Sequence, residues 1–128
     1  KVTGVQTCAL PICAVFLSQP DGTYAYEPLP LKAQFAPIYA IAVGDFDGDG
    51  DIDALAGGNL YKTKPEIGRY DALQGVYLEN DGKGHFSILQ GGRGFKLGGE
   101  IRSILTLDNL VLVGRNSDTL ALFNYAKN

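Results

Sequence analysis

Residues 41–56 read IAVGDFDGDGDIDALA, which places five alternating aspartates between two short apolar runs. The runs are rich in Ile, Val, Leu and Ala and are bounded by glycine, as is typical of two buried β-strands joined by a loop. Five carboxylates in nine residues repel one another unless a cation lies among them. The stretch therefore predicts a strand, an ion-binding loop and a second strand.

The ion expected in this loop is Ca²⁺, because oxygen-only ligands with several carboxylates disfavour softer metals, and Mg²⁺ keeps more of its water. Gly50, at the sixth position, permits the sharp bend that such a loop needs. The expected ligands are four side chains, at positions one, three, five and nine, and one backbone carbonyl at position seven: Asp45, Asp47, Asp49, Asp53 and, through its carbonyl, Asp51.

Two alternatives to this calcium loop are an EF-hand and an acidic turn without metal. An EF-hand requires Glu at position twelve and a helix on each side, whereas position twelve is Ala56 and the flanks resemble strands. We expect an ion that holds the loop between its strands rather than one that bridges to a ligand. Extracellular sites of this kind bind Ca²⁺ with a Kd on the order of 10⁻⁴–10⁻³ M.

The rest of the chain also favours strands, and no window has a helical period over twelve residues. Turn-forming residues such as those at 20–22 and 80–84 separate the runs. We expect an all-β fold whose strands cover residues 14–17, 23–26, 38–43, 52–56, 75–78, 85–89, 101–107, 110–114 and 119–123.

An internal repeat relates the two halves of the chain. Residues 15–22 resemble 76–82 with an offset of 61, and residues 38–41 resemble 101–104 with an offset of 63. Repeated short strands suggest a β-propeller or a β-solenoid. The offset exceeds the roughly 40–50 residues of a common blade, so we expect an inserted polar loop at 61–71.

The second copy lacks the aspartate loop and retains only Asp108 and Asn109, which are too few ligands for an equivalent site. We therefore predict one Ca²⁺ site rather than two. In the inserted loop, Glu66, Arg69 and Asp71 are expected to form an ion-pair network, with a ligand-facing role as the alternative.

Composition and motifs exclude several functions. Hydrophobic residues make up 45% and charged residues 20% of the chain, as in ordinary globular proteins. The net charge of −3 argues against a nucleic-acid-binding face, and no apolar run reaches the ~18 residues of a membrane helix. His85 is the only histidine, so a zinc site or catalytic triad lacks its partners, and we predict no enzymatic activity.

Residues 2–12 read VTGVQTCALPI, which resembles the translation of a common sequencing adapter. Residues 1–13, including Cys8 and Cys13, are therefore expected to be an artefact, and the cysteines support no disulfide prediction. The domain that remains is then residues 14–128.

The segment 36–53 resembles an FG-GAP/VCBS repeat, and residues 78–86 are similar to the hairpin of the same repeats. Residues 65–71 and 113–118 resemble the C-terminal part of bacterial VCBS proteins related to the ASPIC/UnbV, cartilage-acidic-protein-like group. The resemblance covers nearly everything after Cys13. It implies a β-propeller with Ca²⁺ in its repeat loops, an extracellular, cell-surface or periplasmic location, and integrin-α-like roles in adhesion or recognition.

Together these features predict an all-β partial β-propeller of about two blades, from the C-terminal end of a longer chain whose remaining blades would be its partners. The expected function is that of a non-catalytic Ca²⁺-binding scaffold for a protein or glycan ligand. The alternative is an accessory propeller of a larger extracellular enzyme, such as a carbohydrate-active one.

Overall fold

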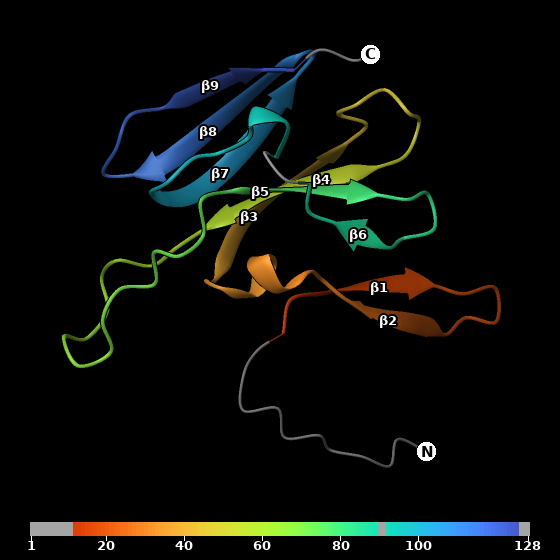
Figure 1. The fold of residues 1–128 in the computed structure, drawn as a ribbon, viewed down its shortest axis with the longest axis horizontal. Helices are drawn as coiled ribbons and strands as arrows, with labels where there is room; N and C mark the ends of the chain where they lie inside the picture. The colour runs from red at the N-terminus through yellow and green to blue at the C-terminus, as the bar shows by residue number, and fades with distance from the viewer. Residues whose placement is uncertain (1–11, 90–91, 126–128) are drawn as a thin grey trace.

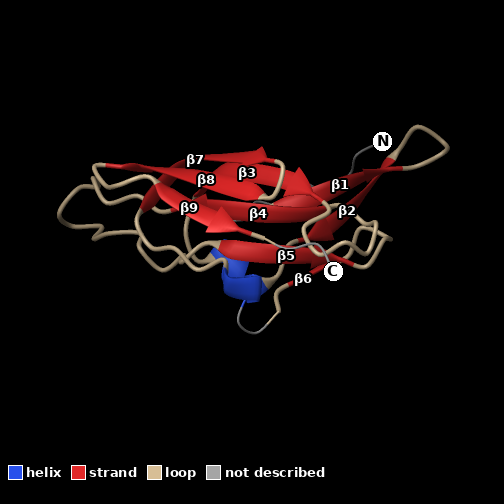
Figure 2. Ribbon diagram, turned by 90° about the horizontal axis from the view of Figure 1, so that it is seen from above, coloured by secondary structure: helices blue, strands red, loops and turns tan. Residues whose placement is uncertain are grey.

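The computed structural model describes residues 12–89 and 92–125, and in this part of the chain all regular structure is β apart from two 3₁₀ turns. The prediction of an all-β fold is confirmed, and strands dominate the view in Figure 2. The elements are β1 (Ala14–Ser18), β2 (Tyr24–Pro28), η1 (Leu31–Gln34), β3 (Ile38–Gly44), β4 (Asp53–Gly58), β5 (Val76–Asn80), β6 (Phe86–Ser87), η2 (Gly92–Gly94), β7 (Glu100–Leu107), β8 (Leu110–Asn116) and β9 (Ala121–Asn124).

The strands form three antiparallel sheets, each connected in simple chain order. The sheet β3-β4-β5-β6 occupies the middle of the molecule, with β7-β8-β9 on one side and the hairpin β1-β2 on the other (Figure 1). The described residues do not close into a propeller. The adapter-like segment lies outside the described residues up to Pro11, whereas the backbone of Cys13 is hydrogen-bonded to the Gln34 side chain.

The structure contains a repeat of 62 residues, between the predicted offsets of 61 and 63. It separates the starts of β1 and β5 (14 and 76), of β2 and β6 (24 and 86), and of β3 and β7 (38 and 100). The register of β3 with β4 shifts between Ile38 and Ala40, and that of β7 with β8 shifts between Ile101 and Ser103. The residues at these two bulges stack on each other, with the Arg102 guanidinium carbon 4.3 Å from the centroid of the Tyr39 ring. The first hairpins of the two sheets, β3-β4 and β7-β8, therefore carry a β-bulge at corresponding positions.

Both faces of the central sheet are partly buried. On one face Leu55 and Tyr77 pack in a cluster with Ile101, Val111 and Val113 of the β7-β9 sheet. The opposite face packs against segments outside the sheet, in a second cluster that contains Ala33, Ala36, Ala54, Ala56, Leu73, Val76 and Leu78. Every residue of β4 is buried as a result.

Strand β4 differs from its predicted extent because it continues through Gly57 and Gly58 instead of ending before them. A Cβ atom on Gly57 would lie 2.5 Å from Cδ1 of Ile101, and one on Gly58 would lie 1.7 Å from the carbonyl oxygen of Pro37. These glycines therefore allow close packing inside a strand rather than a turn at its end. Strand β6 is also shorter than the predicted 85–89.

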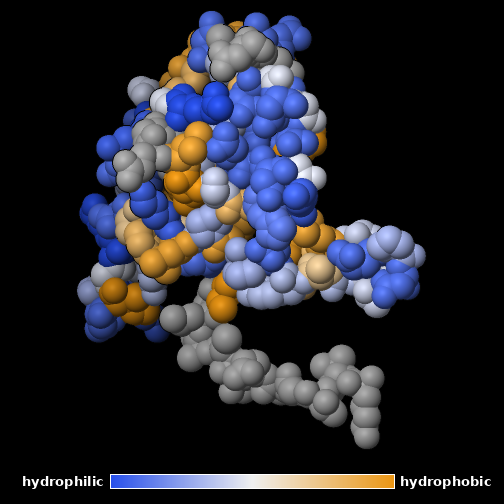
Figure 3. Space-filling model, turned by 45° about the vertical axis from the view of Figure 1, so that its right-hand side comes forward, coloured by the Kyte–Doolittle hydropathy of each residue, from blue (hydrophilic) through white to orange (hydrophobic). Residues whose placement is uncertain are grey.

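The surface combines polar residues with exposed apolar ones. On the face shown in Figure 3 hydrophilic residues predominate, and apolar residues emerge between them in separate patches. Neither helical turn in the described part of the chain has the length and apolar character needed to cross a membrane.

Candidate metal centre

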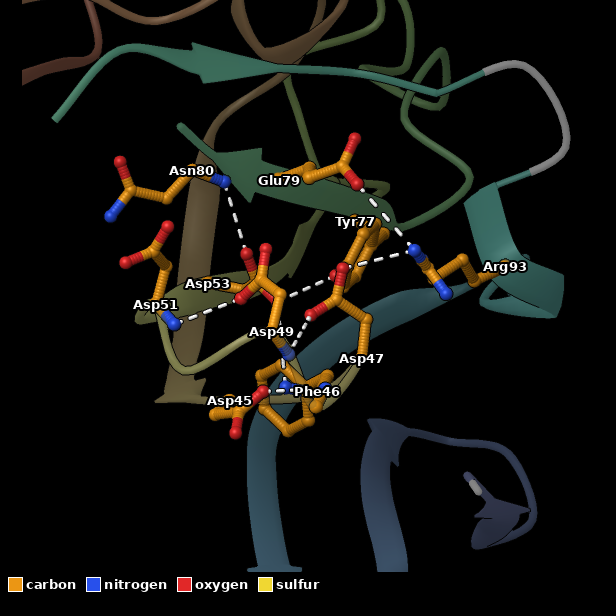
Figure 4. A network of polar contacts seen from close by, with 11 residues as sticks. Asp45, Phe46, Asp47, Asp49, Asp51, Asp53, Tyr77, Glu79, Asn80 and Arg93 are labelled. Atoms are coloured by element: carbon orange, nitrogen blue, oxygen red, sulfur yellow. Dashed lines mark hydrogen bonds and ion pairs between the residues drawn. The ribbon is translucent and has the colours of Figure 1, made fainter. Parts of the chain in front are cut away.

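The aspartate loop connects β3 to β4 and brings three carboxylates together (Figure 4). Oxygen atoms of Asp45, Asp47 and Asp49 all lie within 4.8 Å of one another, so these three side chains could hold a metal ion. Gly48 and Gly50 have φ values of 85° and 95°, a left-handed conformation that lets the chain turn tightly between the aspartates.

Hydrogen bonds within the loop fix the orientation of these carboxylates. Asp45 Oδ1 accepts a hydrogen bond from the Gly48 amide at 2.6 Å, and Asp47 Oδ1 accepts one from the Asp49 amide at 3.1 Å. Asp49 Oδ1 in turn accepts a hydrogen bond from the Asp51 amide at 2.8 Å. Asp45, Asp47 and Asp49 therefore each close a short side-chain-to-backbone turn, and these turns shape the loop.

Phe46 attaches the beginning of the loop to the core. Its buried ring makes edge-on contacts with Tyr77, at a centroid distance of 6.4 Å, and with Tyr125, at 5.1 Å. Edge-to-face aromatic pairs of this kind stabilise a core beyond the area that they bury. The polar aspartates on either side of Phe46 are thereby held at the end of the β3-β4 hairpin.

Asp53 attaches the other end of the loop to β5, and its carboxylate is fully buried. Asp53 Oδ2 accepts hydrogen bonds from the Tyr77 hydroxyl at 2.5 Å and, more weakly, from the Phe46 amide at 3.4 Å. Asp53 Oδ1 accepts a hydrogen bond from the Asn80 amide at 3.0 Å. Burial, together with the hydrogen bond to Asp53, raises the pKa of the Tyr77 hydroxyl, which therefore remains a donor.

The predicted ligands thus separate into two groups. The structure brings Asp45, Asp47 and Asp49 together, whereas Asp53 is outside that group and is bonded to β5. Its role as an ion ligand, like that of the Asp51 carbonyl, stays a prediction.

The Asp51 side chain lies toward the β5-β6 turn, where a Cβ atom on Gly82 would be 2.6 Å from Asp51 Oδ2. The pKa of Asp51 is raised by burial and then by neighbouring carboxylates, of which Asp49 and Asp53 contribute most. A bound cation would oppose this effect because it stabilises the ionised carboxylates.

Arg93 is part of the site although it is distant in sequence. Its Nη2 atom lies 2.9 Å from Asp47 Oδ2 and 3.5 Å from Glu79 Oε1, and its guanidinium carbon lies 5.8 Å from the centroid of the Tyr77 ring. In the sequence, Arg93 lies within the glycine-rich stretch 91–94. An arginine between glycines carries no signal that would associate it with an aspartate loop 46 residues away.

The other candidate sites of the sequence have simpler surroundings. His85 lies beside β6, with Nδ1 3.1 Å from Asp81 Oδ2 on the exposed β5-β6 turn. The predicted ion-pair network of Glu66, Arg69 and Asp71 is wrong for the described residues, where Arg69 instead stacks on Tyr61 at 5.6 Å. The inserted segment is closed by paired backbone hydrogen bonds between Leu60 and Tyr70, so it needs no network to hold its shape.

The repeat-related hairpin β7-β8 has no comparable group of ligands. Its strands are joined by Asp108 and Asn109 alone, with Asp108 at a φ of 50°. Among the described residues, Asp45, Asp47 and Asp49 form the one group of three or more potential metal ligands.

Comparison of the chain with protein-family models, with curated proteins and with solved structures found no match. The FG-GAP/VCBS resemblance therefore stays a prediction that rests on the residues quoted for it, and the site must be interpreted from its own geometry.

Proposed function

We propose that the chain is a calcium-binding β-repeat module that acts as a non-catalytic binding scaffold. The observation that carries this proposal is the convergence of the Asp45, Asp47 and Asp49 oxygens at the turn of one hairpin. Three carboxylates supply hard oxygen ligands, and an exposed loop with two left-handed glycines suits the flexible coordination that Ca²⁺ accepts.

The ion would act on the part of the loop that protein contacts leave least constrained. Phe46 and Asp53 already attach the two ends, whereas Asp49 and Gly50 are exposed at the tip. An ion held by the three aspartates would neutralise their repulsion and fix the tip. Its proposed role is therefore structural.

The proposed location of the module follows from the expected affinity for Ca²⁺. A site with a Kd on the order of 10⁻⁴–10⁻³ M fills only where Ca²⁺ is plentiful, so we place the module outside the cytoplasm, in a secreted, cell-surface or periplasmic protein. Its sheets would be successive blades of a β-propeller that presents loops to a protein or glycan ligand. Loops on a rigid β scaffold commonly carry recognition.

Thermal unfolding with and without Ca²⁺ tests the proposal. Saturation at about ten to one hundred times Kd stabilises a folded protein by roughly 1.4–2.7 kcal/mol. We therefore expect a Tm several degrees higher in about 10 mM Ca²⁺, which is ten to one hundred times the expected Kd, than in chelator, and calorimetric titration should give one site per chain.

Two variants make this test specific. Asp49→Asn should abolish the Ca²⁺-dependent shift, whereas Glu66→Gln removes the same charge from an exposed residue of the inserted loop and should leave the shift intact. Equal Tm values with Ca²⁺ and chelator, two equal sites, or equal loss of the shift in both variants would each contradict the proposal.

A further inference from the structure

A pocket of about 380 Å³ lies at the start of β5. It is lined by β5, by the segment just before it, and by the two connectors that join β2 to β3 and β6 to β7. None of the described lining residues belongs to the β1-β2 hairpin or to the β7-β9 sheet, so the pocket does not lie on either outer sheet face. Its volume is at the lower end of the roughly 300–1,000 Å³ that is usual for sites of small organic ligands, which favours a compact ligand.

The floor of the pocket is apolar and is part of the protein core. It consists of four buried residues from the two core clusters, Leu73, Val76, Tyr77 and Phe95. The Tyr77 hydroxyl is already used, because it donates a hydrogen bond to Asp53 Oδ2 at 2.5 Å. Tyr77 therefore offers a ligand its ring rather than its hydroxyl, and this floor is best matched by hydrocarbon.

Contacts within the protein fix the shape of the pocket. The Leu97 amide donates a hydrogen bond to the Gln74 carbonyl oxygen at 2.9 Å, which holds the β6-β7 connector against the segment before β5. A Cβ atom on Gly75 would lie 3.0 Å from Cε1 of Phe95, so the backbone and the ring are in close contact. Phe35, from the β2-β3 connector, is 50% exposed and adds an apolar wall at the mouth.

The charge of the lining has a single sign. Lys32 and Lys96, one from each connector, are the charged residues among the described lining residues, and both are exposed. Neither lysine forms an ion pair with a carboxylate in the described part of the chain. The pocket therefore joins local positive charge to an apolar cavity although the chain carries a net charge of −3, and this combination complements an anion.

We propose that this pocket binds a small organic carboxylate, with the apolar body of the ligand on the floor and its carboxylate beside Lys32 and Lys96. Each ammonium group ends a flexible stem, which lets it reach a carboxylate at the mouth. A monoanion fits better than a phosphate dianion, because taking a second charge out of water beside an apolar surface costs more. No residue of the aspartate loop lines the pocket, so this site goes beyond the calcium proposal and does not rest on it.

Titration of the full chain with 4-phenylbutyrate, followed by amide NMR spectra, tests the proposal. We expect saturable shifts of the amide signals of Val76, Leu89 and Lys96, which line the pocket. The alcohol 4-phenylbutanol has the same ring and chain but no charge. It should bind about two- to twenty-five-fold more weakly, because it lacks two exposed ion pairs that contribute about 1.4- to fivefold each.

Two pairs of lysine variants make this test specific. Lys32→Gln combined with Lys96→Gln should weaken 4-phenylbutyrate binding by the same two- to twenty-five-fold and leave 4-phenylbutanol binding unchanged. Both lysines are exposed, so the fold should persist, and each single variant should show a 1.4- to fivefold loss if the double variant fails to fold. Lys62→Gln combined with Lys64→Gln removes the same charge from exposed residues of the inserted loop, and this matched control should bind both probes like the wild type.

Phe35→Ala tests the apolar part of the pocket and should weaken both probes, because it removes an exposed wall that the two ligands share. The proposal would be overturned by the absence of shifts at the three pocket amides, or by shifts concentrated on the β7-β9 sheet instead. Equal affinity for the two probes would also overturn it. So would equal weakening of 4-phenylbutyrate in the two double-lysine variants, which would indicate that only the overall charge of the protein matters.

Discussion

At the scale of single residues, Arg93 is the least expected member of the site. Its guanidinium shares the Asp47 carboxylate with any ion that the aspartates hold, since the Arg93 Nη2 atom lies 2.9 Å from Asp47 Oδ2. The ion pair partly neutralises the loop without metal, and it also opposes the binding of a cation. Arg93 is therefore placed to adjust how tightly the loop would hold the proposed Ca²⁺ ion.

Replacing Arg93 with Gln should tighten Ca²⁺ binding by about 1.4- to fivefold, because partly exposed ion pairs are worth roughly 0.2–1 kcal/mol. Calorimetric titration of the wild type and the variant measures the change. Arg115→Gln is the control, since Arg115 pairs with Asp118 near the β8-β9 connection rather than with the aspartate loop. An unchanged or weaker affinity in Arg93→Gln would show that Arg93 does not compete with the ion.

At the scale of strands and hairpins, the contacts between sheets decide which residues each strand can contain. The 2.5 Å separation between a hypothetical Cβ on Gly57 and Cδ1 of Ile101 shows that β4 and β7 approach too closely for any side chain at this position. Glu100, the first residue of β7, joins the same region by accepting hydrogen bonds at 2.9 Å from the Tyr61 amide, from Asn116 and from Arg102.

Gly57→Ala should destabilise the protein by about 1–3 kcal/mol, the usual cost of overpacking a well-packed core. Urea unfolding monitored by circular dichroism measures this loss. Gly98→Ala is the matched control, because a Cβ there would meet no atom within 4 Å, and its stability should stay close to that of the wild type. Equal stability of the two variants would mean that the sheets can separate slightly at no cost.

Glu100 should also make stability depend on pH. The Tyr61 amide, followed by the Asn116 side chain, lowers the pKa of Glu100 below its ordinary value of 4.5. Because the folded pKa is the lower one, the stabilisation is present above pH 4.5 and disappears as the pH falls through the folded value.

Thermal unfolding in chelator between pH 7 and about 3 should therefore show a smaller acid-induced loss of Tm for Glu100→Gln than for the wild type. The variant should start from a lower Tm at neutral pH, where the carboxylate interactions are lost. Raised groups such as Asp51 act in the opposite direction in both proteins, so the difference between the two curves isolates Glu100. Parallel curves would exclude this role.

At the scale of the whole molecule, local sequence predicted the strands well because short apolar runs between turn residues describe a β meander with few alternatives. All nine predicted segments overlap observed strands in the described residues. The errors arose where tertiary contact overrides local preference, as at Gly57 in β4.

The candidate metal site likewise combines local contacts, which the sequence predicts, with long-range contacts, which it does not. The alternating aspartates place Asp45, Asp47 and Asp49 together through local turns alone, and the sequence was sufficient to predict this. The contacts of Asp53 with Tyr77 and of Asp47 with Arg93 span 24 and 46 residues. They depend on how the sheets and the η2 turn pack, for which a single sequence contains no pattern.

The paired hairpins have a consequence for protein engineering. Strands β3 and β4 are joined by residues 45–52, and the equivalent strands β7 and β8 by Asp108 and Asn109, yet both pairs keep the same bulge. The scaffold thus accepts two connectors of very different length and chemistry at one structural position. The end of this hairpin is a natural grafting point, where a designed recognition loop can be installed in place of Asp108 and Asn109 without altering the sheets that support it.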